Sequence, residues 1–176
     1  MRKLSLKHLI AALMALTLVI FIGVSVSVAG KAIKAGGKIK ASYTEQKEFE
    51  IGDVDGHRIS FTTSEGINTS TGDIEMLDGA SIINYSLDDL VNGSGSGHGY
   101  IKVMKENDGM ISKWEHKVVT TMTDEGTPST AFEGTFKYTG GMGKYSNITG
   151  GGTYKGMFVS KTEYVVEWQG EYSLGE

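Results

Sequence analysis

One segment of the chain, residues 162–174, alternates apolar and polar residues with a period of two. Its alternating positions hold Tyr164, Val166, Trp168 and Tyr172 on one side, and Glu163, Glu167, Gln169 and Glu171 on the other. Successive side chains of a β-strand point to opposite faces, so this pattern predicts a strand with one buried face and one face in water. From residue 38 onward, no long stretch has the helical period of 3.6 residues. This part of the chain is therefore expected to be all-β.

The same alternation recurs between turn signals along the chain. The sequences DVDG at 53–56 and NDG at 107–109 predict tight turns, because Asp-Gly tolerates the positive φ angles that hairpins require. The expected strands are residues 38–51, 57–63, one or two within 74–86, 100–106, 110–121, 130–138, 153–159 and 162–174. Residues 64–73 and 92–99 are expected to be loops. About eight strands with short connections are typical of an antiparallel sandwich or an up-and-down barrel. We predict a single antiparallel eight-stranded barrel, because closure removes exposed strand edges.

The N-terminal segment has the pattern of a signal peptide. Basic residues precede a mostly apolar run at 9–22, and the small residues Ser27 and Ala29 fit a signal-peptidase site. We predict that residues 1–29 are a cleaved signal helix and that the protein is periplasmic or secreted by a bacterium. The alternative is an uncleaved anchor, since ~20 residues span a bilayer. Membrane contact is otherwise expected only through this segment before cleavage. Residues 30–37 are expected to be a linker, and residues 38–176 the barrel domain.

Charge and the absence of cysteine exclude several classes of protein. The chain has 17 Lys and Arg against 21 Asp and Glu, so its charge of −4 becomes −7 when the three basic residues of the leader are removed. This balance argues against nucleic-acid binding. Without cysteine the chain has no disulfide, no thiolate zinc site and no cysteine nucleophile.

Neither the glycines nor the histidines have the spacing of a cofactor site. Glycine makes up 25 of 176 residues, but Gly143-Lys144 is followed by Tyr145, where a phosphate loop needs Ser or Thr. The alternate glycines of residues 93–99 also miss the dinucleotide-binding spacing. The histidines beyond the leader are His57, His98 and His116. No two of them have the spacing of a local metal pair, so we predict no metal and no cofactor.

Aromatic residues on the apolar faces of the expected strands are the candidates for the barrel interior. They are Tyr43, Phe61, Trp114, Phe136, Tyr154, Tyr164 and Trp168. His57 and His116 share such faces and are expected to point inward. A barrel of ~8 strands either fills its interior with side chains or leaves room for one small ligand. The predicted ligand-binding residues are His57, Phe61, Trp114, His116, Phe136, Tyr164 and Trp168.

Residues 132–154, FEGTFKYTGGMGKYSNITGGGTY, resemble the glycine signature of allene oxide cyclases and dirigent proteins. Those families have a Gly-Gly-Thr-Gly step, an aromatic residue two positions later and a further glycine before the next strand. The likeness covers residues 130–172, includes EWQGEY at its end, and is shared with uncharacterised bacterial secreted proteins. Met142 stands where those families usually have Thr. The resemblance implies a calycin-like barrel of eight strands and a cofactor-independent cyclase or isomerase, and it carries no catalytic residue onto this chain.

Three functions are compatible with these features. The first is a barrel that binds a small apolar or aromatic molecule in its interior. The second is the cyclase or isomerase that the resemblance implies, which acts by shaping a substrate in a dry cavity. The third is a non-catalytic envelope protein with a filled barrel, whose outer surface makes the interactions. We predict the first, because the sequence contains no recognisable catalytic set. A filled interior would contradict the first two alike.

Overall fold

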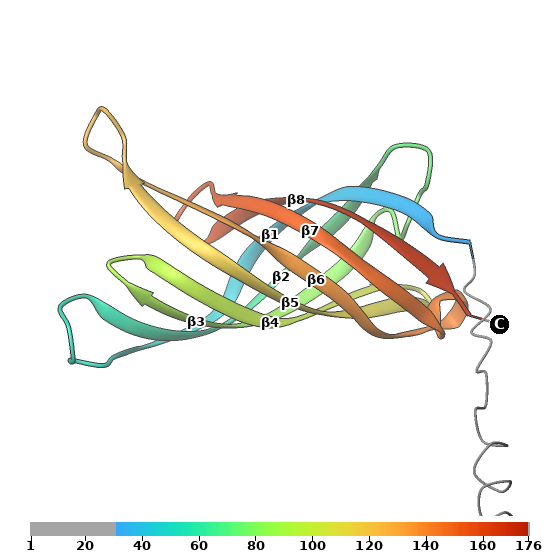
Figure 1. The fold of residues 1–176 in the computed structure, drawn as a ribbon, viewed down its shortest axis with the longest axis horizontal. Helices are drawn as coiled ribbons and strands as arrows, with labels where there is room; N and C mark the ends of the chain where they lie inside the picture. Colours follow the sequence, from blue (N-terminus) through green and yellow to red (C-terminus); the bar gives the residue numbers. More distant parts are fainter. Residues whose placement is uncertain (1–30, 176) are drawn as a thin grey trace, which may run out of the picture.

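The computed structural model describes residues 31–175 and shows antiparallel strands closed into one barrel (Figure 1). Each strand pairs with its neighbours in the chain, and β1 pairs with β8 to close the barrel. The elements are β1 (Ile33–Glu50), β2 (His57–Thr71), β3 (Ala80–Val91), β4 (Ser94–Lys105), β5 (Asp108–Met122), β6 (Pro128–Met142), the short 3-10 helix η1 (Gly143–Tyr145), β7 (Ile148–Phe158) and β8 (Glu163–Leu174). This confirms the predicted eight-stranded antiparallel barrel.

The predicted signal peptide, residues 1–29, lies outside the described residues. Residues 31–175 contain no helix with the length and apolarity of a membrane span.

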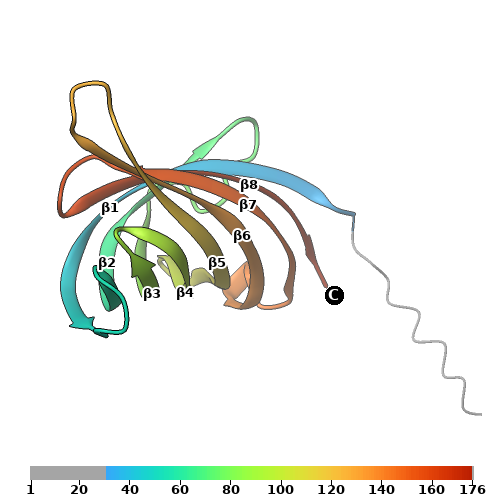
Figure 2. The same ribbon diagram turned by 60° about the vertical axis from the view of Figure 1, so that its left-hand side comes forward.

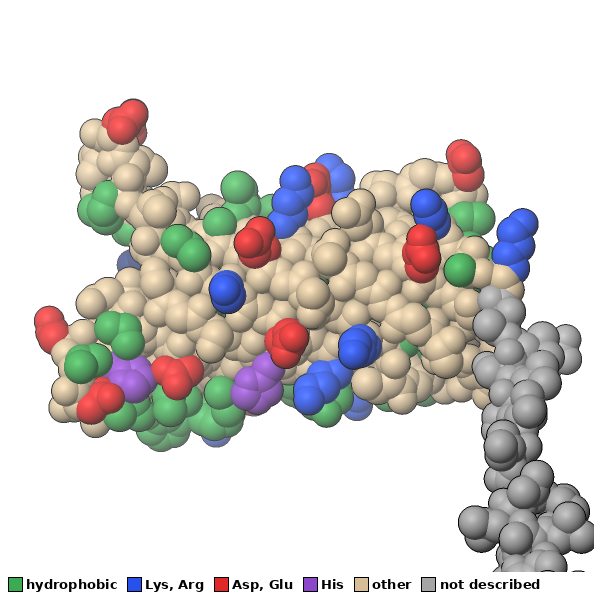
Figure 3. Space-filling model, in the orientation of Figure 1, with side chains coloured by type: hydrophobic (Ala, Val, Ile, Leu, Met, Phe, Trp, Pro, Cys, Tyr) green, Lys and Arg blue, Asp and Glu red, His purple; other side chains and the backbone are tan. Residues whose placement is uncertain are grey.

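Strand β8 has the two faces that its sequence predicts. The inward residues Tyr164, Val166, Trp168 and Tyr172 are all buried. On the outer face, Glu167 forms ion pairs with Lys38 of β1 at 3.0 Å and with Lys155 of β7 at 3.6 Å. Figure 3 shows further acidic and basic side chains on this side of the molecule. Such exposed pairs each contribute little to stability, but they keep this face in water.

Two segments predicted to lack secondary structure are strand. Within the predicted linker, residues 30–37, the chain enters β1 at Ile33 and pairs with β8. Strand β2 continues to Thr71, through the predicted loop at 64–73. Both segments are rich in glycine and other small or polar residues, which weaken the strand signal of the few β-branched residues among them, such as Ile33 and Ile67.

The predicted loop at 92–99 is mostly strand as well. Only Asn92 and Gly93 form a turn, with φ angles of 51° and 76°, and β4 begins directly after them at Ser94. Positive φ at both central positions is the geometry of a two-residue hairpin. The glycines that follow therefore belong to the barrel wall.

The faces of β2 are the reverse of the prediction. Its inward positions are polar and hold Ser60, Thr62, Ser64 and Asn68. His57 and Phe61, predicted to point inward, lie on the outer face, where Phe61 is 47% exposed and packs edge-on against Phe49 of β1. Polar residues are accepted inside because they find partners across the barrel, as Ser64 Oγ does 2.6 Å from Tyr164 Oη.

The two ends of the barrel differ. At one end, the connection between β2 and β3 buries Met76 and Leu77. The side-chain amide of Asn68 donates hydrogen bonds to both of their carbonyl oxygens, at 3.1 and 2.9 Å, and Tyr138 Oη lies 3.8 Å from the sulfur of Met76. This end is therefore filled. The hairpin turns β1–β2, β3–β4, β5–β6 and β7–β8 lie at the opposite end, and Figure 2 shows the strands curving around a common axis between the two.

Candidate functional site

The barrel contains a cavity of about 330 Å³ between the filled end and the end with the hairpin turns. Aromatic rings form much of its wall: Tyr43, Trp114, Phe132, Phe136, Tyr138, Tyr154, Phe158, Tyr164 and Trp168. Near the hairpin turns, the exposed residues Gln46, Glu48 and Lys161 line its mouth. Small-molecule sites commonly have volumes of roughly 300–1,000 Å³. The interior is thus large enough for one small organic molecule.

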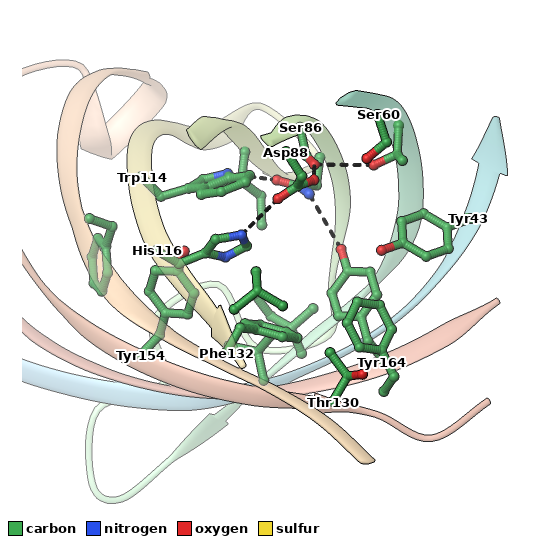
Figure 4. Close-up of a pocket in the computed structure, with 18 of the residues that line it drawn as sticks. Tyr43, Ser60, Ser86, Asp88, Trp114, His116, Thr130, Phe132, Tyr154 and Tyr164 are labelled. Atoms are coloured by element: carbon green, nitrogen blue, oxygen red, sulfur yellow. Dashed lines mark hydrogen bonds and ion pairs between the residues drawn. The ribbon is translucent and has the colours of Figure 1, made fainter. Parts of the chain in front are cut away.

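Two ionisable side chains meet on one wall of this cavity (Figure 4). The carboxylate of Asp88, on β3, lies 2.8 Å from Nε2 of His116, on β5. Strand β4 separates the two strands. The register sets Asp88 opposite Gly97 and Gly97 opposite His116. The two side chains therefore meet directly over Gly97.

This contact depends on the missing side chain at Gly97. A Cβ atom there would overlap the Asp88 carboxylate and lie 2.6 Å from His116 Nε2, closer than real Cβ atoms come. The next inward position, Gly99, is covered in the same way by the indole of Trp114. Glycine lets other groups approach the backbone closely. The glycines of β4 thus make room for the polar wall of the cavity.

The other polar atoms of this wall bind one another. Ser86 Oγ donates a hydrogen bond to Asp88 and accepts one of 3.2 Å from Thr62 Oγ1. Beside them, the Asn84 side chain accepts a hydrogen bond of 2.8 Å from Trp114 Nε1. Buried polar groups are stable when they are paired in this way. The network holds the carboxylate of Asp88, whose side chain is 13% exposed, in one position.

The imidazole of His116 is held among aromatic rings. Its centroid lies 4.8 Å from that of Trp114, 5.3 Å from Phe132 and 6.3 Å from Tyr154. A carboxylate only accepts hydrogen bonds, so the pairing with Asp88 places the proton of the neutral ring on Nε2. The other nitrogen, Nδ1, then carries a lone pair and has no hydrogen-bond partner among the described residues.

Tyrosine hydroxyls stand across the cavity from this pair. The hydroxyl of Tyr43 points toward the centre of the cavity in Figure 4 and has no hydrogen-bond partner within residues 31–175. Burial, with a smaller effect from Tyr164, raises the pKa of Tyr43 above its usual value of 10.0. The hydroxyl therefore stays protonated and is free to donate. By contrast, the hydroxyl of Tyr164 already forms a hydrogen bond with the hydroxyl of Ser64.

Five of the predicted ligand-binding residues line this cavity: Trp114, His116, Phe136, Tyr164 and Trp168. The other two, His57 and Phe61, do not, because β2 turns its opposite face inward. His57 instead lies between two carboxylates on the outer side. It hydrogen-bonds Asp53 through Nδ1 and Asp89 through Nε2, the latter at 2.8 Å. These bonds, that to Asp53 foremost, raise the pKa of His57 above 6.5.

The sequence interpretation missed Asp88, the partner of His116. The strand expected within 74–86 stopped before it, although Ser86, Asp88 and Leu90 continue the same period of two. Glycine at every second position of 95–99 is a second missed signal. That spacing indicates a strand with one face that carries no side chains.

The three histidines of residues 31–175 do not converge on a metal site. His116 points into the cavity, whereas His57 and His98 lie on outer faces. Within residues 31–175, no group of three or more His, Asp or Glu side chains is placed to hold a metal ion. Comparisons of the chain with protein-family models, with curated proteins and with solved structures find no match.

Proposed function

We propose that the protein binds a small, uncharged, largely aromatic or apolar molecule inside the barrel. The observation that carries this proposal is the cavity of about 330 Å³, walled by aromatic rings and with one cluster of polar side chains on a single side. An apolar enclosure with a few convergent polar groups is the usual form of a small-molecule site. The aromatic wall supplies affinity through burial of ligand surface, and the polar cluster orients the ligand.

The charges around the cavity favour an uncharged ligand. Asp88 is the acidic group of the polar wall, and its carboxylate already accepts a hydrogen bond from His116. The basic side chains that line the cavity are His116, which is hydrogen-bonded to Asp88, and Lys161, which is exposed at the mouth. An anionic ligand inside the barrel would lie near Asp88 without a cation to neutralise it, and a buried unpaired charge is costly.

The wider setting of this function is part of the same proposal. The closed barrel of eight strands supports kinship with the allene oxide cyclase and dirigent families, and the pattern of residues 1–29 supports export to the periplasm or the medium. An envelope protein with a filled barrel is less well supported, because the interior holds open space.

Two neighbouring residues of β5 provide a direct test of binding. Val118 lines the cavity and is buried, whereas Val119 points outward and is 53% exposed. We expect wild type and Val119→Phe to bind the neutral fluorescent probe N-phenyl-1-naphthylamine, with enhanced emission. Val118→Phe should lose at least about 10-fold in affinity, because the added ring occupies the cavity. Circular dichroism checks that each variant is folded. Binding that is absent in wild type, or equal in both variants, would contradict the proposal.

A second function, a cofactor-independent isomerase or cyclase, is favoured by one specific observation. The Asp88–His116 pair places a nitrogen lone pair beside the cavity, where it can accept a proton as well as a hydrogen bond. A catalytic base is distinguished from a binding group by its effect on proton transfer rather than on affinity.

A further inference from the structure

We infer that His116 is a general base and that the cavity takes an uncharged carbonyl compound with an acidic C–H bond, the base removing that proton. This inference rests on the proposed binding function. The sequence placed His116 on an inward face without a partner, and Asp88 became visible as that partner only in the fold.

The first argument is the fixed tautomer of the imidazole. Asp88 accepts a hydrogen bond from Nε2–H, with 2.8 Å between Nε2 and the carboxylate oxygen, and is itself held by Ser86. The proton of the neutral ring therefore stays on Nε2. Nδ1 is left as an acceptor, without a partner among the described residues. A carboxylate that orients a histidine and stabilises its charged form is the arrangement used by many enzymes with a histidine base.

The second argument concerns the surroundings of the base. The His116 ring lies between Trp114 and Phe132, so it cannot rotate freely, and its side chain is 11% exposed. Water therefore competes little for Nδ1. A group held in one position in a largely dry site transfers protons to a bound molecule more effectively than the same group in water.

The third argument is a hydrogen-bond donor on the opposite side. The Tyr43 hydroxyl faces His116 across the cavity in Figure 4, and its raised pKa keeps it protonated. A carbonyl group that accepts this hydrogen bond gains a donor where negative charge develops when a neighbouring C–H bond breaks. Base and donor on opposite walls fit a planar molecule lying between them.

The polar wall argues against acyl transfer by a serine nucleophile. Ser86 donates its hydrogen bond to the Asp88 carboxylate, rather than to His116. A nucleophilic serine needs an adjacent base to take its proton. The lone pair of His116 is therefore available to the ligand and is not used to activate Ser86.

The proposed step is a balanced proton transfer. The C–H bond beside the carbonyl breaks and its proton moves to Nδ1 of His116. The electron pair of that bond passes to the carbonyl oxygen, which forms an enolate that accepts a hydrogen bond from Tyr43 Oη. The imidazolium, stabilised by Asp88, then returns the proton to the same carbon or to a conjugated one. The product is the starting compound or its isomer, so the step needs no oxidant, reductant or second substrate.

The test uses 2-tetralone, an uncharged bicyclic ketone with acidic C–H bonds, in deuterium oxide. Proton NMR follows deuterium incorporation beside the carbonyl, and displacement of N-phenyl-1-naphthylamine measures binding. We expect wild type to accelerate exchange over buffer and His116→Gln to lose about 100-fold or more of that acceleration. Tyr43→Phe should lose about 10-fold or more, with little change in binding. His98→Gln, which removes an imidazole from the outer face, is the matched control and should equal wild type.

A separate readout tests the positioning role of Asp88. Nitrogen-15 NMR of the imidazole should show the proton of His116 on Nε2 in wild type. In Asp88→Asn the amide can also donate, so the ring should shift toward the other tautomer, with a parallel loss of exchange activity. A purely structural Asp88 would leave the tautomer unchanged.

The outcomes separate this inference from the proposed function. If 2-tetralone binds but exchanges no faster than in buffer, or equally fast with His116→Gln, the inference is overturned and the binding function stands. If the fluorescent probe binds but 2-tetralone does not displace it, the carbonyl class is wrong and the inference again fails. If neither compound binds to folded wild-type protein, both proposals fail.

Discussion

Asp88 and His116 form their hydrogen bond across an intervening strand, over a glycine that lies opposite both of them. Each side chain projects from its own strand, and the contact needs the space above β4 to be empty. The geometry of the polar wall is therefore set by a residue that has no polar side chain.

Replacing that glycine gives the first prediction. Gly97→Ala should separate Asp88 from His116 and destabilise the fold by about 1–3 kcal/mol, the usual cost of forcing extra volume into a packed site. Urea unfolding measures the stability, and nitrogen-15 NMR of His116 reports the lost contact. The control is Gly140→Ala in β6, where an added Cβ meets no atom within 4 Å, and its stability should change by less than about 0.5 kcal/mol. Equal effects at both positions would contradict this account of β4.

The cluster around His57 predicts a pH dependence of stability. Hydrogen bonds to Asp53 and Asp89 raise the pKa of His57 above 6.5, so the charged form is favoured in the folded state. The resulting stabilisation is fully present below the unfolded pKa of about 6.5 and is lost as the pH rises through the higher folded value.

The measurement compares wild type with His57→Gln. The difference in free energy of unfolding should be largest near about pH 6 and should shrink toward about pH 9. His98→Gln removes an imidazole that has no ion-pair partner among residues 31–175, and it controls for the loss of a histidine as such. A difference that stays constant with pH would show that the carboxylates do not act on His57 in this way.

Asn68 connects the cavity to the filled end of the barrel. Its oxygen accepts a hydrogen bond of 2.9 Å from Trp168 Nε1, and its amide holds the carbonyl oxygens of Met76 and Leu77. Asn68→Leu leaves these buried groups unpaired and should cost about 1–3 kcal/mol or more. Asn147→Leu, at an exposed asparagine near the C-terminus, should change stability by less than about 0.5 kcal/mol. Thermal and urea unfolding of both variants provide the comparison.

Two phenylalanines that the sequence places in one class should behave differently. Phe136 lines the cavity and packs against Tyr138 and Trp168, so Phe136→Ala should cost about 3 kcal/mol and alter probe binding. Phe61 lies on the outer face, so Phe61→Ala should leave the affinity for N-phenyl-1-naphthylamine unchanged. Fluorescence titration with N-phenyl-1-naphthylamine measures the affinity of both variants. Weaker binding by Phe61→Ala would contradict the placement of Phe61 outside the cavity.

The parts of the fold predictable from sequence are those in which local pattern and burial agree. Strand β8 alternates large apolar and charged residues, and its faces are as expected. Strand β2 differs, because its serine, threonine and asparagine side chains point inward and its phenylalanine points outward. Period two locates a strand in both cases, but the hydrophobic rule assigns the wrong face when the interior carries a hydrogen-bonded polar wall.

The site was only half predictable for a related reason. His116 lies on an apolar face and was expected to point inward, which the structure confirms. Its contact with Asp88 depends on the register of two successive hairpins, and no local pattern encodes that register. The spaced glycines at 95–99 indicate only that one face of β4 leaves room for side chains of its two neighbours to touch, without saying which residues meet there.

The filled end of the barrel limits the routes by which a small molecule could enter and leave the cavity. With Met76 and Leu77 packed into one end, a molecule in the cavity has to leave by the route through which it entered. A molecule bound in the cavity would therefore enter and leave at the end with the hairpin turns, where Gln46, Glu48 and Lys161 line the mouth.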